Sequence, residues 1–134
     1  MAVKIIRPAE RELVPVRPTG APAGAAASAV STAGLPLAAD PPIKRQVVSD
    51  DEPYAHIVEA PARHVIAAHS HSRTEVTVIL AGTAQVAGAQ CGPGTVIVVP
   101  ADEEYSIEVG DAPLTMVVMR PGRAAYRWAT TRAE

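Results

Sequence analysis

Two histidines and a glutamate in the stretch "HSHSRTEVTVILAG", residues 69–82, have the types and spacing of metal ligands. Residues two apart on a β-strand point to the same side, so His69 and His71 present imidazoles on one face, roughly 6.6 Å apart along the backbone. Residues 72–74 predict a tight reversal, after which Glu75 opens a new strand and can aim its carboxylate at the same point. Two imidazoles and one carboxylate on one side of an ion form the facial triad typical of non-haem iron.

The alternative is that two half-buried histidines and a solvated carboxylate share this stretch by chance. For one histidine that alternative would be preferred. The chain holds only four histidines in 134 residues, however, and two of them fall at this spacing before Glu75 and Gly82. We therefore predict that His69, His71 and Glu75 bind a metal ion.

The elements that must position these side chains are short strands. From about residue 53 onward, Val- and Ile-rich runs alternate with turn signals, which is typical of a sandwich or small barrel. No Phe, 13 Pro and 9 Gly also favour β structure over long helices. The runs are "YAHIVEA", "RHVIAAHSH", "EVTVILAG", "AQVAG", "TVIVVP", "YSIEVG" and "LTMVVMR".

Residues 1–52 are predicted to form an N-terminal arm or extension, and residues 53–134 the barrel. "VKIIR" and "ELVPVR" are each candidate strands, with Pro15 restricting the second to an edge. Residues 18–42 are rich in Ala, Pro and Gly. They are either a flexible tail or linker, or an ordered arm that covers the barrel mouth or crosses to a partner subunit.

Length and charge exclude several classes of protein. A chain of 134 residues fits one domain. A net charge of −2, with 12 basic residues scattered along the chain, predicts no nucleic-acid partner. A single cysteine excludes an internal disulfide and suits the cytoplasm. The N-terminus lacks the apolar run of a signal peptide, and Pro and Gly interrupt the Ala-rich run, so no membrane segment is expected.

The chain resembles the cupin superfamily, whose first motif reads G, five residues, HxH, three or four residues, E, six residues, G. His69, His71, Glu75 and Gly82 match it, while Arg63 occupies the leading glycine position. The second motif reads G, five residues, PxG, two residues, H, three residues, N. Here "GTVIVVPADEEYSIEV" supplies Gly94 and Pro100, with Asp102 at the next glycine position and Tyr105 at the histidine position. The resemblance covers roughly residues 53–121 and implies a double-stranded β-helix, or jelly-roll barrel.

The resemblance also implies roles for individual residues. In metal-binding cupins the motif histidines and the glutamate are the usual ligands, which gives His69, His71 and Glu75 that role here. The fourth ligand position falls to Tyr105. A neutral phenol is a weaker ligand than imidazole, so Tyr105 is predicted to be a pocket residue near the metal, which supports it or moves a proton.

The substrate pocket is predicted from strand parity. Thr77 and Ile79 share the face of Glu75, and Ile107 shares the face of Tyr105. Arg73 falls in a rim loop, where a guanidinium can meet an anionic substrate.

Two further histidines have other predicted positions. His64 lies five positions before His69, so on an uninterrupted strand it faces the other way and is predicted at the surface. His56 shares a face with Tyr54 and Val58, a face that either borders the pocket or lies outside.

The predicted function is that of a metal-dependent enzyme acting on a small molecule, with a homodimer as the expected assembly. Three protein ligands leave room on the ion for a chelating substrate and dioxygen, which favours a dioxygenase acting on a diketone or enol. Fe(II) is favoured, while Mn(II), Ni(II), Cu(II) and Zn(II) also suit these ligands. One alternative is a redox-neutral lyase, isomerase or cyclase, with Tyr105 as acid or base. The other is a non-catalytic ligand-binding or sensor cupin.

Overall fold

The computed structural model describes residues 3–15 and 43–128. The predicted Ala-, Pro- and Gly-rich segment 18–42 lies outside the described residues. In chain order the elements are η1 (Pro8–Glu10), β1 (Val14–Pro15), β2 (Lys44–Asp50), β3 (Tyr54–Ala60), β4 (Val65–His71), β5 (Glu75–Ala81), β6 (Ala84–Val86), β7 (Ala89–Cys91), β8 (Val96–Val99), β9 (Tyr105–Val109), β10 (Leu114–Arg120) and β11 (Tyr126–Trp128).

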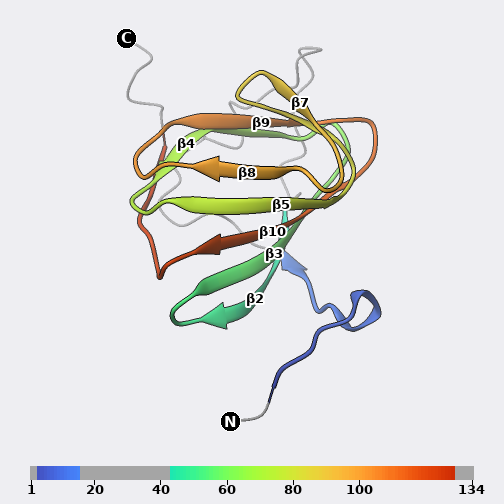
Figure 1. Cartoon of the computed structure of the whole chain (residues 1–134). Coiled ribbons are helices and arrows are strands. Elements are labelled where there is room, and N and C mark those ends of the chain that lie inside the picture. Colours follow the sequence, from blue (N-terminus) through green and yellow to red (C-terminus); the bar gives the residue numbers. More distant parts are fainter. Residues whose placement is uncertain (1–2, 16–42, 129–134) are drawn as a thin grey trace.

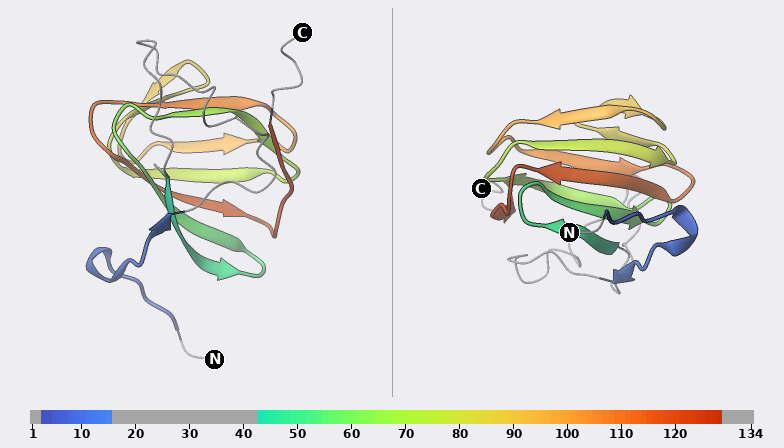
Figure 2. Two further views of the ribbon diagram at one scale, coloured as in Figure 1. Left: turned by 180° about the vertical axis from the view of Figure 1, so that it is seen from behind. Right: turned by 60° about the horizontal axis from the view of Figure 1, so that its bottom comes forward.

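The strands form two antiparallel sheets, as Figure 1 shows. One has the order β1-β2-β3-β10-β5-β8 and the other the order β11-β4-β9-β6-β7. The chain crosses from one sheet to the other between β3 and β4 and again between β4 and β5, so strands distant in sequence become neighbours. The all-β jelly-roll class predicted from the sequence is confirmed. Seen from behind and from below, residues 3–15 lie beside the β2–β3 end of the barrel (Figure 2).

A single hydrophobic core lies between the sheets. Ile79 and Leu114 are its largest fully buried side chains. In the absence of Phe, small aliphatic side chains dominate it, since branched residues pack well on pleated surfaces. The buried members are Val58, Ala60, Ile66, Ile79, Ala84, Val86, Ile107, Val109, Leu114, Met116 and Val118.

Left-handed backbone occurs at four positions that align with the glycines of the two cupin motifs. Gly82 and Gly94 have φ values of +83° and +87°. Arg63 and Asp102 stand where the motifs have glycine, and their φ values are +65° and +66°. The turns therefore keep this conformation even where the residue differs. At Gly82 a glycine is also required by space, because an added Cβ would lie 2.3 Å from the carbonyl oxygen of Pro113.

The predicted strands of the barrel all occur, but the N-terminal region differs from its prediction in part. "VKIIR" forms no strand. In the described part of "ELVPVR", residues 12–15, the strand is β1, an edge strand paired with β2. Strand β2 lies within the predicted arm, yet it pairs with β3 in the six-stranded sheet. The sequence also did not predict the short strands β7 and β11. Within residues 3–15 and 43–128, no helix is long and apolar enough to cross a membrane.

Candidate functional site

A cavity of about 460 Å³ opens between the two sheets, and four of the eight polar or charged residues buried in the described part of the chain line it. Its size suits a small organic molecule. Core residues such as Ile66, Ile107 and Met116 form part of its wall. The wall residues able to do chemistry include His56 from β3, His69 and His71 from β4, Glu75 from β5, Tyr105 from β9 and Arg120 from β10.

The histidine pair faces the cavity as the spacing predicts. His69 and His71 are 3% and 4% exposed, and their rings meet edge to face with centroids 5.0 Å apart. The Nδ1 atom of His69 lies 2.8 Å from the carbonyl oxygen of Ala67, which can only accept a hydrogen bond. In the neutral ring, Nδ1 therefore carries the proton and Nε2 is the basic nitrogen.

A bulge in β4 sets which residues reach the interior. The register with β9 shifts between Ile66 and His69, so Ile66 and the two odd-numbered histidines all line the cavity. The same shift turns His64 inward. The prediction of a surface position for His64 is therefore wrong: its side chain is buried, at 9% exposed.

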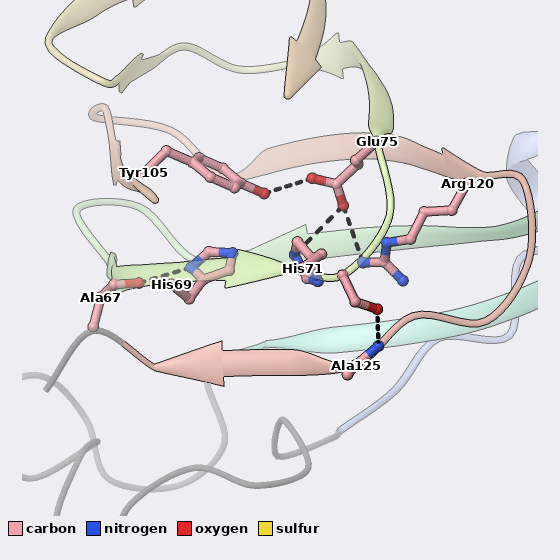
Figure 3. Close-up of polar contacts among 8 residues, drawn as sticks. Ala67, His69, His71, Glu75, Tyr105, Arg120 and Ala125 are labelled. Carbon is pink, nitrogen blue, oxygen red and sulfur yellow. Dashed lines mark hydrogen bonds and ion pairs between the residues drawn. The ribbon is translucent and has the colours of Figure 1, made fainter. Parts of the chain in front are cut away.

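Glu75 is the centre of the polar network in Figure 3. The Tyr105 hydroxyl donates a hydrogen bond of 2.6 Å to its Oε2 atom, and Arg120 Nη2 donates one of 3.0 Å to its Oε1 atom. His71 Nε2 lies 3.7 Å from Oε1. The side chains of Glu75 and Arg120 are only 3% and 10% exposed, so this ion pair is shielded from water. Both carboxylate oxygens are thus already engaged by protein groups.

The histidines of the cavity are neutral at neutral pH. Burial, followed by the charge of Arg120, lowers the pKa of His71 to about 3. Burial and the charges of Arg120 and Arg45 lower the pKa of His56 to about 3. Burial also lowers the pKa of His69. The close approach of His71 to Glu75 is therefore a contact between a neutral ring and a carboxylate.

Two residues of this site were not assigned from the sequence. His56, left between two positions, lines the cavity and is 5% exposed. Arg120 ends the run "LTMVVMR", which the sequence predicts as a strand without indicating which of its two faces points inward. It shares parity with Met116 and Val118, and all three face the cavity. The inward face of β10 is decided by its pairing with β5, which places Val118 opposite Thr77. The sequence alone does not show this pairing.

Of the four residues predicted to form the pocket wall, Ile107 lines the cavity and the other three do not. Thr77 and Ile79 are buried on the same face as Glu75, but they are not among the residues lining the cavity. The reason is that β5 continues past the cavity into the core, where Ile79 packs. Arg73 lies in the loop between β4 and β5 with its side chain exposed, and it does not line the cavity either.

The predicted metal site can be compared with this geometry. His69, His71 and Glu75 do converge, and neutral imidazoles suit a metal. Within the described part of the chain, however, no three His, Cys, Asp or Glu side chains are arranged to hold an ion. Arg120 places a permanent positive charge 3.0 Å from Oε1 of Glu75, where it would repel a metal ion bound by that carboxylate. In this arrangement the residues do not fit a three-ligand metal site.

Comparison with known proteins places the fold. No protein-family profile and no curated sequence matches the chain. Among solved structures, the polyketide cyclase RemF from Streptomyces resistomycificus matches with a TM-score of 0.71 at 16% identity, over 96% of this chain and 86% of its own. An RmlC-like cupin from Ralstonia eutropha matches with a TM-score of 0.66 at 11% identity, over 94% and 73%. KdgF from Halomonas sp. matches with a TM-score of 0.54 at 21% identity, over 65% and 86%.

These matches and the sheet topology define the fold. The chain has the cupin fold, a double-stranded β-helix, as the resemblance of its motifs implied. Likeness at these identities is a likeness of fold, so the chemistry has to be argued from the cavity.

Proposed function

We propose that this cupin is an enzyme that moves a proton on a small carbonyl compound, in a redox-neutral reaction such as cyclisation, isomerisation or elimination. The observation that carries the proposal is the part-buried chain of contacts from Tyr105 through Glu75 to Arg120 at the wall of the cavity. A phenol that donates a hydrogen bond to an ion-paired carboxylate can pass its proton to that carboxylate while it takes up another.

The proposed step runs through Tyr105. The phenolic oxygen takes a proton from the carbon next to a substrate carbonyl while its own proton passes to Oε2 of Glu75. The C–H electron pair moves into the carbonyl group and gives an enolate. One negative charge thus moves from Glu75 to the substrate oxygen, and Arg120, whose Nη2 atom lies 3.0 Å from Oε1 of Glu75, is the proposed counter-charge.

The histidines have a different role in this proposal. His69 and His71 stay neutral, so they add no charge that would compete with Arg120. The ring of His69 lies 4.6 Å from that of Tyr105, measured between centroids, and packs against the phenol.

The likeness to RemF supports the redox-neutral class. RemF is a polyketide cyclase, and the match includes nearly the whole chain, 96% of it. A cyclisation that joins carbon to a carbonyl group needs no oxidant. Among the alternatives predicted from the sequence, we therefore favour the lyase, isomerase or cyclase.

A metal-dependent reaction, including the predicted dioxygenase, is the second candidate. The hydrogen bond from His69 Nδ1 to Ala67 favours it, because metal-binding histidines are commonly oriented by such a bond on the other ring nitrogen. An ion such as Fe(II) would require Glu75 to give up Arg120 or Tyr105. The homodimer and the cytoplasmic location likewise stay predictions.

The proposal is tested by hydrogen exchange in D₂O with 4-oxopentanoate, a stable keto acid, as the probe. We expect the protein to accelerate deuterium uptake at the carbons next to the ketone, as followed by NMR, and Glu75→Gln to abolish that acceleration. Glu108→Gln, the same change on the adjoining wall strand β9 but outside the cavity lining, is the matched control. If the wild-type protein binds the probe without accelerating exchange, the non-catalytic binding cupin is supported instead.

A further inference from the structure

Four neighbouring strands of the six-stranded sheet each contribute one charged or polar side chain to the cavity wall. β5, β10, β3 and β2 lie in this order and contribute Glu75, Arg120, His56 and Arg45. Glu75 and Arg120 form the ion pair described above. His56 and Arg45 lie beyond it, away from Glu75, and the proposed proton transfer does not use them.

His56 carries a buried ring nitrogen without a hydrogen bond to the described part of the chain. Its side chain is 5% exposed, and its Nδ1 atom has no hydrogen bond among the described residues. The Nε atom of Arg120 is also buried and without a hydrogen bond there. Buried polar atoms nearly always have partners, so two such nitrogens on the wall of one cavity point to a ligand that supplies acceptor atoms.

The charges lining the cavity do not cancel. Asp50 is paired with Arg123, whose Nε donates to its Oδ1 at 2.8 Å, and Glu75 is paired with Arg120. Arg45, half-buried on β2, has no ion-pair partner within residues 3–15 and 43–128. Its charge nevertheless acts on His56, since it is one of the causes that lower the pKa of that residue. The β2–β3 side of the cavity therefore carries an excess positive charge.

We propose that this side of the cavity is a carboxylate subsite, in which Arg45 and His56 bind an anionic group of the substrate. His56, as a neutral ring with the proton on Nδ1, donates one hydrogen bond, and Arg45 supplies the charge. The substrate is then a keto acid whose carboxylate lies at β2 and β3 and whose carbonyl faces Tyr105 and Glu75. The orientation of the substrate rests on the proposed function, whereas the subsite itself is testable by binding alone.

The test uses two probes of nearly equal shape, 4-oxopentanoate and 2,5-hexanedione, which differ by a carboxylate in place of an acetyl group. We expect the wild-type protein to bind the acid at least about tenfold more tightly in calorimetry, because hydrogen bonds to a charged group are about twice as strong as neutral ones. Arg45→Gln should remove most of this preference and leave the affinity for the dione unchanged. Lys44→Gln, the same loss of charge at the exposed neighbouring position, should leave the preference intact.

His56 is tested with two variants. His56→Leu should weaken binding of the acid severalfold, and His56→Asn, which keeps a donor near the position of Nδ1, should restore most of it. Thermal unfolding checks that each variant is folded. Equal affinity for the two probes, no binding of the acid at tens of millimolar, or a preference that survives Arg45→Gln would overturn the subsite. Failure of Glu75→Gln to change hydrogen exchange would overturn the proposed function but leave the binding preference untouched.

Discussion

Tyr105 and Glu75, thirty positions apart in the chain, are joined by a hydrogen bond of 2.6 Å between the phenolic oxygen and Oε2. Tyr105 belongs to the five-stranded sheet and Glu75 to the six-stranded one, so the bond spans the cavity from sheet to sheet. Its length is typical of a hydroxyl that donates to a charged oxygen. The same hydrogen bond therefore links the two sheets and joins the two residues of the proposed proton transfer.

Replacing Tyr105 with Phe should separate chemistry from folding. The substitution keeps the ring against His69 but removes the proton path, so deuterium exchange of 4-oxopentanoate should slow by about 100-fold or more. Leaving Oε2 of Glu75 without its donor should cost about 1–3 kcal/mol in the free energy of unfolding. NMR exchange rates and urea unfolding measure the two effects. Full exchange activity in folded Tyr105→Phe would rule out the phenol as the proton carrier.

The pair of Arg120 and Glu75 should show strong coupling in stability. Arg120→Met leaves a carboxylate buried without its cation and is expected to cost about 3–5 kcal/mol. Adding Glu75→Leu removes that unpaired charge, so the double variant should be more stable than Arg120→Met alone. Urea unfolding of both single variants and the double variant gives the coupling energy. A double variant as unstable as the sum of the two single changes would mean that the ion pair is not formed.

The sequence was enough to predict the barrel and the histidine pair because both depend on local periodicity. Residues two apart on one strand share a face wherever that strand lies, and His69 and His71 do so. Arg120 and His56 were not assigned because their direction depends on which strands pair across the sheet. His64 is buried because of the bulge in β4. The bulge adds one residue and so shifts the alternation of inward and outward side chains, which the sequence does not reveal.

Gly82 should tolerate substitution much less than Gly88. Both have left-handed backbone, with φ of +83° and +82°, so alanine is strained at either position by about 1–2 kcal/mol. Only at Gly82 would the new Cβ also meet backbone, 2.3 Å from Pro113 O, whereas nothing lies within 4 Å at Gly88. Gly82→Ala should therefore lower the urea midpoint clearly more than Gly88→Ala. Equal losses in the urea midpoint would mean that the added Cβ at position 82 does not clash with Pro113.

Acidification should destabilise the fold through its buried histidines. His56 takes a proton near pH 3 in the folded chain but near its ordinary pKa of 6.5 when unfolded. Between these values the unfolded state binds more protons, so stability is full above about pH 6.5 and falls as the pH drops toward 3. The slope is up to about 1.4 kcal/mol per pH unit for each such histidine.

The variant His56→Asn isolates one part of that slope. It removes a single titrating ring, so the free energy of unfolding between pH 6.5 and 4.5 should change less steeply than in the wild-type protein. Urea unfolding at several pH values measures the difference. An unchanged slope would mean that His56 is not buried in its neutral form.

The most direct test of the proposed proton transfer is the rate of deuterium exchange in 4-oxopentanoate by protein freed of metal with a chelator and kept under nitrogen. Metal analysis of the same sample verifies that no ion is left. We expect the rate to equal that of untreated protein in air, because Tyr105, Glu75 and Arg120 carry the reaction without oxidant or ion. Exchange that disappears on chelation and returns with one particular metal, or that requires oxygen, would contradict this and favour the metal-dependent candidate.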